Sequence, residues 1–76
     1  MTKQELMTSY KVDLDDTNEQ NFNGLYDMLV DYEIATVEEI KLVMNINGIN
    51  IDSLLAILYA RTGLRSIEQL INDLKD

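Results

Sequence analysis

The side chains that could do chemistry in this chain of 76 residues are carboxylates, and they are concentrated in its first half. Residues 1–39 hold ten acids against two bases, whereas residues 40–76 hold four of each, so the first half carries the whole net charge of −8. Paired carboxylates can serve as general acid and base, but they need a cleft or a neighbour that tunes their pKa, and the sequence indicates neither. The chain also has no cysteine and no histidine. We therefore expect that the protein is not an enzyme, and we expect no catalytic, cofactor-binding or metal-binding residues.

The acidic segment 13–24 has the length of a calcium-binding loop, and its sequence can be compared with such a loop. A calcium loop needs glycine at its sixth residue for a sharp turn and glutamate at its twelfth to bind the ion through both oxygens. These two positions hold Asn18 and Gly24 in this chain. The segment therefore does not predict a calcium site.

A second acidic pattern predicts a surface that binds a partner. Glu19, Asp27 and Asp31 are separated by multiples of four residues, so a helix over 18–33 would place them along one face. Such a surface repels nucleic acids and anionic membranes and attracts basic proteins. Tyr26 could add an aromatic anchor beside it. The predicted partner-binding residues are Asp15, Glu19, Tyr26, Asp27 and Asp31. The alternative interpretation is a solvated face that only keeps the protein soluble.

The elements that position these residues are predicted to be short helices, because helix-start signals recur along the chain. In a capping box, Ser or Thr is followed three residues later by Glu or Gln, and the pattern begins at Thr2, Thr17, Thr36 and Ser66. A further helix is predicted to start at Asn50 or Asp52. Residues 13–18 are expected to interrupt the first helix because their side chains can bond to the local backbone, although one continuous helix is an alternative. Met1 is expected to pack on Leu6.

Apolar residues recur every three or four positions, which is typical of helices with one buried face. The expected core stripes are Leu6, Tyr10 and Leu14; Phe22, Leu25, Leu29 and Tyr32; Val37, Ile40, Val43 and Met44; Leu54, Leu55, Leu58 and Tyr59; and Ile67, Leu70, Ile71 and Leu74. Gly24 lies inside the helix predicted over 18–33 and costs about 1 kcal/mol relative to Ala unless close packing requires it. We predict an all-α fold, a compact bundle of four to five short helices in one domain over 1–76.

Residues 45–51, Asn-Ile-Asn-Gly-Ile-Asn-Ile, are compatible with two structures. Asn-Gly between alternating Ile and Asn is a strong hairpin signal, with Ile46 facing Ile49 across the turn. Alternatively, Gly48 ends the preceding helix in a left-handed conformation and Ile49 makes the apolar contact of a Schellman motif, a pattern that Gly63 repeats. Because an isolated hairpin this short is marginal in water, we favour the helix end over an α fold with a small hairpin at 44–51.

Two helices joined by a turn with glycine also suggest a helix-turn-helix, in which the second helix reads DNA. That helix would have no Lys or Arg before Arg61, and the net charge of −8 opposes binding to DNA. We therefore expect no direct contact with nucleic acid, and a helix-turn-helix-like regulator is the weakest alternative. Arg61 and Arg65 are expected to form salt bridges with acids of the first half.

The expected location is the cytoplasm, without a membrane partner. No stretch approaches the roughly 20 apolar residues that span a bilayer. The first residues lack the apolar core of a signal peptide, and the lack of cysteine fits a reducing compartment.

A resemblance to known proteins is carried by the segments Ile-Leu-Tyr-Ala-Arg-Thr-Gly (57–63) and Arg-Ser-Ile-Glu-Gln (65–69), although neither is a diagnostic motif. The second half of the chain is similar to small, acidic, uncharacterised proteins of phages and mobile elements of Gram-positive bacteria. The resemblance implies a protein that binds and blocks host proteins, nucleases included, in some cases by imitating the charge of DNA. It assigns no functional residue.

Charge and resemblance together predict a non-enzymatic acidic binding protein. It would act as an inhibitor or modulator that presents its acidic face to a basic host protein, for example a nucleic-acid-binding one, as a phage anti-defence protein or a DNA mimic does. Its location would then be the cytoplasm of the host cell. The alternative is a structural protein that self-assembles into a homo-oligomer through apolar surface of the helix over 52–61.

Overall fold

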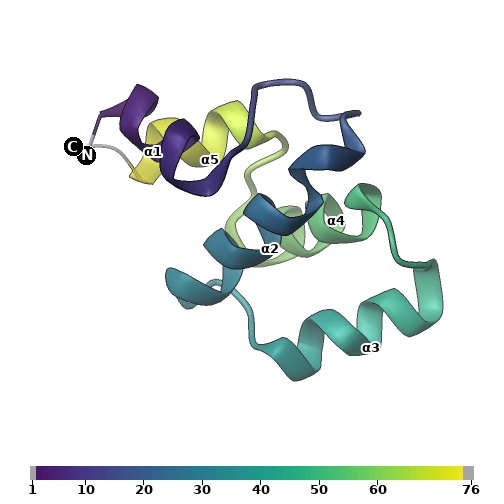
Figure 1. Cartoon of the computed structure of the whole chain (residues 1–76). Helices are drawn as coiled ribbons and strands as arrows, with labels where there is room; N and C mark the ends of the chain where they lie inside the picture. The colour runs from purple at the N-terminus through teal and green to yellow at the C-terminus, as the bar shows by residue number, and fades with distance from the viewer. Residues whose placement is uncertain (1, 75–76) are drawn as a thin grey trace.

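The computed structural model describes residues 2–74, which form five α-helices and one short 3₁₀ helix (Figure 1). Their bounds are α1 Lys3–Tyr10, η1 Glu19–Asn21, α2 Phe22–Asp31, α3 Val37–Asn47, α4 Ile51–Thr62 and α5 Ile67–Leu74. No β-strand occurs within the described residues. The predicted all-α bundle is therefore confirmed, and the alternative with a hairpin at 44–51 is wrong. No helix within this range is long and apolar enough to cross a membrane.

The helices follow one another along an elongated molecule of 34 × 22 × 18 Å. In Figure 1, α1 and α5 lie side by side at one end, α2 and α4 form the middle, and α3 lies at the opposite end. The main contacts agree with this order, because α1 packs on α2 and α5, α2 packs on α4, and α3 packs on α4. Helix α3 therefore lies at the edge of the bundle.

One cluster of buried aliphatic side chains, contributed by every α-helix, forms the core. The apolar side chains of this cluster with no exposed area are Leu6, Leu25, Met28, Leu29, Ile40, Leu54, Leu58, Ile67, Leu70 and Ile71. Most of them belong to the predicted stripes. Three predicted core residues are wrong, because the structure leaves Leu14, Tyr32 and Tyr59 exposed at 37%, 39% and 52%. Leu14 lies beyond the end of α1, and Tyr32 lies just beyond the end of α2.

Local capping bonds start the helices where the sequence predicts them. The Thr2 hydroxyl accepts from the Glu5 N–H at 3.1 Å, and the Glu5 carboxylate accepts from the Thr2 N–H at 3.2 Å, which completes a capping box. The predicted box at Thr17 is wrong. The helix η1 begins at Glu19 and is capped by Asn18, whose side chain accepts from the Gln20 N–H at 3.0 Å, while the Thr17 hydroxyl donates to Asp15 at 2.7 Å. The predicted packing of Met1 falls outside the described residues.

The later helix starts also use the predicted cap residues. Thr36 accepts from the Glu39 N–H at 3.1 Å, Asn50 from the Ser53 N–H at 3.0 Å and Ser66 from the Gln69 N–H at 3.1 Å. Each bond satisfies a backbone donor that has no partner within its own helix. Asn50, and not Asp52, is thus the cap of α4.

The predicted interruption after the first helix is confirmed, and the continuous helix is wrong. Lys11 ends α1 in a left-handed conformation (φ 57°, ψ 46°), and its N–H bonds to carbonyls of the last turn. The chain then folds back so that α2 packs closely on the end of α1. A Cβ atom on Gly24 would lie 2.2 Å from the Tyr10 carbonyl oxygen and 2.3 Å from Val12 Cγ1. Close packing therefore requires glycine within α2.

Gly48 and Gly63 end α3 and α4, but they do so in different ways. Gly63 is left-handed (φ 78°, ψ −3°), as predicted, and its N–H donates to the Tyr59 carbonyl at 2.8 Å. Gly48 is extended at positive φ (φ 102°, ψ 160°), and Ile49 is 80% exposed, so the predicted Schellman motif is wrong. The extended exit leaves the Gly48 carbonyl free to accept from the Ser53 hydroxyl at 2.7 Å.

Candidate partner-binding surface

The acidic loop between α1 and η1 is organised around the side chain of Asn21, which is 2% exposed. Its Oδ1 accepts from the Asp13 N–H at 3.0 Å. Its Nδ2 donates to the Asp13 carboxylate at 2.9 Å and to the carbonyls of Asp13 and Asp15 at 3.2 and 3.0 Å. One buried amide thus holds the loop, which explains why this polar segment has a defined shape. Nothing in the sequence pattern identified Asn21.

The carboxylate of Asp13 is a hydrogen-bond acceptor inside this loop. It accepts from Asn21 Nδ2, from the Asp15 N–H at 2.9 Å and from Asn18 Nδ2 at 2.8 Å. These bonds, that of Asn21 first, hold the pKa of Asp13 below its usual value. The folded state therefore favours the ionised form of Asp13.

The lowered pKa of Asp13 predicts a loss of stability in acid. The contribution is fully present above the pKa of the unfolded chain and disappears as the pH falls through the lower pKa of the folded state. We expect the unfolding free energies of the wild type and of Asp13→Asn to converge between about pH 5 and pH 2. Urea unfolding followed by circular dichroism at several pH values measures this difference. A difference that stays constant over the range would contradict the prediction.

Asp15, a predicted partner-binding residue, is exposed, but its carboxylate takes part in the loop. Its Oδ1 accepts from the Thr17 N–H at 3.0 Å and from the Thr17 hydroxyl at 2.7 Å. A partner that binds this carboxylate would therefore compete with a local turn.

Two acids of the same region cap distant helices. Asp16 accepts from the Ile67 N–H, the start of α5, at 2.9 Å. Glu19, another predicted partner-binding residue, accepts from the Ile51 N–H, the start of α4, at 3.1 Å. A carboxylate at a helix N-terminus satisfies an unpaired donor and interacts favourably with the helix dipole. These two acids thus stabilise the fold, a role that the sequence analysis missed.

The acidic ridge predicted from the spacing of Glu19, Asp27 and Asp31 is shorter in the structure. The expected continuous helix over 18–33 is wrong in its bounds, because Glu19 lies in η1 and α2 spans Phe22–Asp31. The regular spacing of an α-helix therefore holds for Asp27 and Asp31 and does not extend to Glu19.

Asp31 is exposed at the end of α2 and binds a tyrosine. Its Oδ2 accepts from the Tyr10 hydroxyl at 3.0 Å, and the Tyr10 ring lies 6.3 Å from the Tyr32 ring. Burial, followed by this bond to Asp31, raises the pKa of Tyr10 above its ordinary value. The bond connects α1 to α2, so Asp31 also has a structural role.

Tyr26 is a weaker candidate for an aromatic anchor than the sequence indicated. Its side chain is half-buried, packs against the core and lies 6.4 Å from the Phe22 ring. Tyr59 is more accessible at 52%, and the Arg65 guanidinium lies 5.1 Å from its ring centroid, within the range of a cation–π contact. The predicted salt bridge of Arg65 is therefore replaced, among the described residues, by a contact with an aromatic ring.

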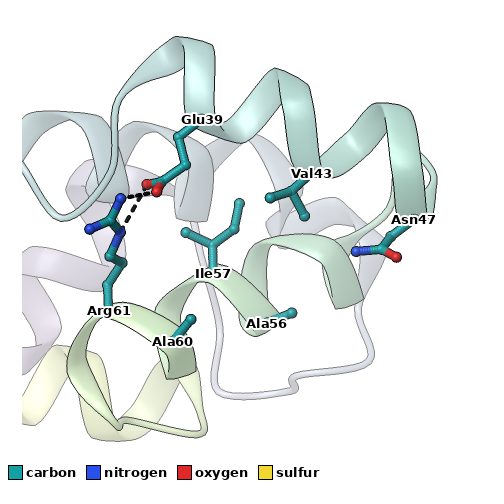
Figure 2. A pocket seen from close by; sticks show the side chains of 7 residues that line it. All are labelled: Glu39, Val43, Asn47, Ala56, Ile57, Ala60 and Arg61. Atoms are coloured by element: carbon teal, nitrogen blue, oxygen red, sulfur yellow. Dashed lines mark hydrogen bonds and ion pairs between the residues drawn. The ribbon is translucent and has the colours of Figure 1, made fainter.

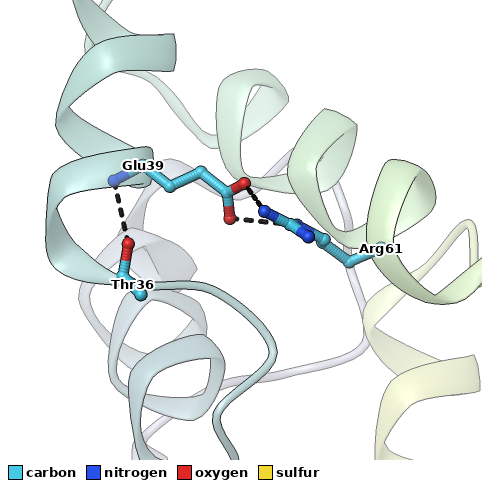
Figure 3. A network of polar contacts seen from close by, with 3 residues as sticks. All are labelled: Thr36, Glu39 and Arg61. Atoms are coloured by element: carbon cyan, nitrogen blue, oxygen red, sulfur yellow. Dashed lines mark hydrogen bonds and ion pairs between the residues drawn. The ribbon is translucent and has the colours of Figure 1, made fainter.

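Glu39 joins α3 to α4, as Figure 3 shows. Its backbone N–H donates to the Thr36 hydroxyl, while its carboxylate accepts from Arg61 Nε at 3.1 Å and from Arg61 Nη2. The predicted pairing of Arg61 with the acidic half is thus confirmed. Of the two bonds of the capping box predicted at Thr36, the structure contains the one from the Glu39 N–H to the Thr36 hydroxyl. The second bond, from the Thr36 N–H to the Glu39 carboxylate, is absent among the described residues, because that carboxylate binds Arg61 instead.

The carboxylates that remain free of such bonds lie on α2, on the turn that follows it and on the first turn of α3. Asp27, Glu33 and Glu38 are exposed, and within the described residues none forms a hydrogen bond or an ion pair through its carboxylate. We call these three residues the free carboxylates. They are the acids of the first half that a partner could bind without displacing an internal bond.

The acidic side chains do not gather into a metal-binding cluster in the described part of the chain, where no group of three or more Asp and Glu residues could hold an ion. Comparisons with protein-family models, with curated proteins and with solved structures found no match to this chain.

Proposed function

We propose that the protein is a non-enzymatic binding protein that presents its acidic first half to a basic partner protein, such as a nucleic-acid-binding protein. The observation that supports this proposal is the set of free carboxylates Asp27, Glu33 and Glu38. The ion pairs formed within residues 2–74 are Lys3 with Glu68 and Arg61 with Glu39, so little of the negative charge of the first half is neutralised internally.

Exposed carboxylates that no internal base neutralises attract basic proteins over several ångströms and repel nucleic acid and anionic lipid. The resemblance to small acidic phage proteins suggests that the partner is a host protein. The protein would then act in the host cytoplasm as an inhibitor or modulator, in the manner of a phage anti-defence protein or a DNA mimic.

The test compares two double variants that each remove two negative charges. In the first, Asp27→Asn and Glu38→Gln remove two free carboxylates. In the control, Asp52→Asn and Asp73→Asn remove exposed carboxylates of the second half. The pairs are matched, because Glu38 and Asp52 each lie in the first turn of a helix. We expect the first pair to weaken binding about tenfold and the control to leave it nearly unchanged.

Binding is measured by capturing basic proteins from a host lysate on the immobilised chain and eluting them with increasing salt. Proteins retained by wild type and control should elute from the first variant at lower salt, because fewer ionic contacts hold them. If both variants retained the same proteins to the same salt concentration as wild type, the proposal would be wrong.

A further inference from the structure

The large apolar side chains that the fold leaves exposed are concentrated on α3, α4 and the turn between them. Among the described residues, this region contains Leu42, Ile46, Ile49 and Tyr59, which are 60%, 73%, 80% and 52% exposed. Leu42 and Ile46 are four residues apart and therefore lie on one side of α3. Single exposed aliphatic residues are common on protein surfaces. Three of them on one helix and the turn that follows it form an exposed hydrophobic patch, which is typical of an interaction surface.

A shallow hollow lies beside this patch, between α3 and α4 (Figure 2). It has a volume of about 230 Å³ and an apolar floor that includes Val43, Ile57, Ala56 and Ala60. Figure 2 shows the Glu39–Arg61 pair closing one end. Ala56 and Ala60 are exposed and small, so α4 leaves room for a larger side chain from outside. The surface therefore carries both a ridge of large side chains and a hollow that could receive one.

The charge of this surface differs from that of the rest of the molecule. Residues 37–62 carry three acids and two bases, a net charge of −1, whereas residues 1–36 carry eight acids and two bases, a net charge of −6. Two copies that approached each other through their first halves would repel strongly. A contact through α3 and α4 would bring together two surfaces of almost no net charge, so the repulsion between the copies would be weaker.

We propose that the face formed by Leu42, Ile46, Ile49 and the hollow beside Ala56, the α3–α4 face, binds a second copy of this chain. A two-fold interface brings a surface against itself, so each side must supply both the projection and the recess. The α3–α4 face meets this requirement, because the ridge formed by Leu42 and Ile46 of one copy can enter the hollow of the other. The sequence alone predicts self-association through the helix over 52–61, whereas the structure adds α3 and the turn that follows it.

The size of the face predicts a weak dimer. Helices of 11 and 12 residues are about 17–18 Å long, so two of them side by side offer less than the roughly 800 Å² that each partner gives to a standard interface. We therefore expect dissociation in the micromolar range. The α3–α4 face adjoins the acidic surface at Glu38, which lies four residues before Leu42 on α3, so the variants below leave all three free carboxylates in place.

Sedimentation velocity between about 1 and 500 μM, a range that brackets such affinities, tests the proposal. The wild type should pass from one chain to two with increasing concentration. Ile46→Glu, which places a charge on the ridge, and Ala56→Lys, which fills the hollow, should each raise the dissociation constant at least about tenfold. Leu14→Glu is the control, because it adds the same charge at an exposed apolar residue outside the face. Circular dichroism should confirm that all three variants keep their helices, since the replaced side chains are exposed.

Three outcomes would overturn the proposal. They are a wild type that stays monomeric over the whole range, an Ile46→Glu variant that associates as tightly as wild type, and a Leu14→Glu variant that weakens association equally. If Ala56→Lys alone left the dimer intact, the insertion of the ridge into the hollow would be wrong. High salt separates this contact from the acidic binding surface, because an apolar interface persists in salt while binding through carboxylates weakens.

Discussion

Replacing Gly24 with alanine is expected to lower the free energy of unfolding by about 3 kcal/mol, the largest effect that we predict for a single methyl group in this chain. The new Cβ would lie 2.2 Å from the Tyr10 carbonyl oxygen and 2.3 Å from Val12 Cγ1. A backbone atom cannot rotate away as a side chain can, so α2 must move off the end of α1. A chain of this length has roughly 4–11 kcal/mol of stability, and a substantial part of it would be lost. Urea unfolding followed by circular dichroism measures the change.

Gly63→Ala is the matched control for this substitution. Gly63 has φ 78°, but a Cβ there would meet no atom within 4 Å. The loss should therefore be about 1 kcal/mol, which is the penalty of a left-handed backbone alone. Equal losses in the two variants would show that the contact between α1 and α2 is not the reason for glycine at position 24.

Asn21→Ala is expected to lower the free energy of unfolding by about 2–4 kcal/mol. The substitution removes four hydrogen bonds from a buried amide and leaves the Asp13 N–H and the carbonyls of Asp13 and Asp15 without that partner. Because Asn21 is the first cause of the lowered pKa of Asp13, that pKa should also rise in the variant. Urea unfolding gives the first quantity, and NMR titration of the Asp13 carboxyl gives the second.

Asn23→Ala serves as the control for Asn21→Ala. Asn23 is exposed within α2, where alanine has the higher helix propensity, so stability should change by less than about 0.5 kcal/mol or increase slightly. If Asn21→Ala were as mild as Asn23→Ala, the loop would not depend on the buried amide.

The features that could be predicted from the sequence are those set by residues close to each other in the chain. The caps Thr2, Thr36 and Asn50 act on a backbone N–H three residues later, so a local pattern identifies them. The apolar spacing likewise identified Leu25, Leu29 and Leu70 as core residues. The presence of Gly24 inside a helix suggested a close contact, but the sequence could not name Tyr10 and Val12 as its partners.

The features that could not be predicted depend on contacts between distant segments. Charge spacing alone placed Glu19 on a free ridge, because nothing near it in the sequence shows that the start of α4 would take its carboxylate. Asp31 was placed on the same ridge for the same reason, although Tyr10 binds it. The exposure of Ile46 and Ile49 depends on α3 lying at the edge of the bundle, which is a property of the whole fold.

The caps that Asp16 and Glu19 provide also determine when the fold can be completed during synthesis. The two bonds connect residues that are 51 and 32 positions apart. Both carboxylates are therefore synthesised well before the backbone N–H groups of Ile51 and Ile67 to which they bind. Until α4 and α5 emerge, the strongly negative first half has neither these donors nor the apolar helices on which α1 and α2 pack. The first half therefore lacks its contacts with α4 and α5 until those two helices have been synthesised.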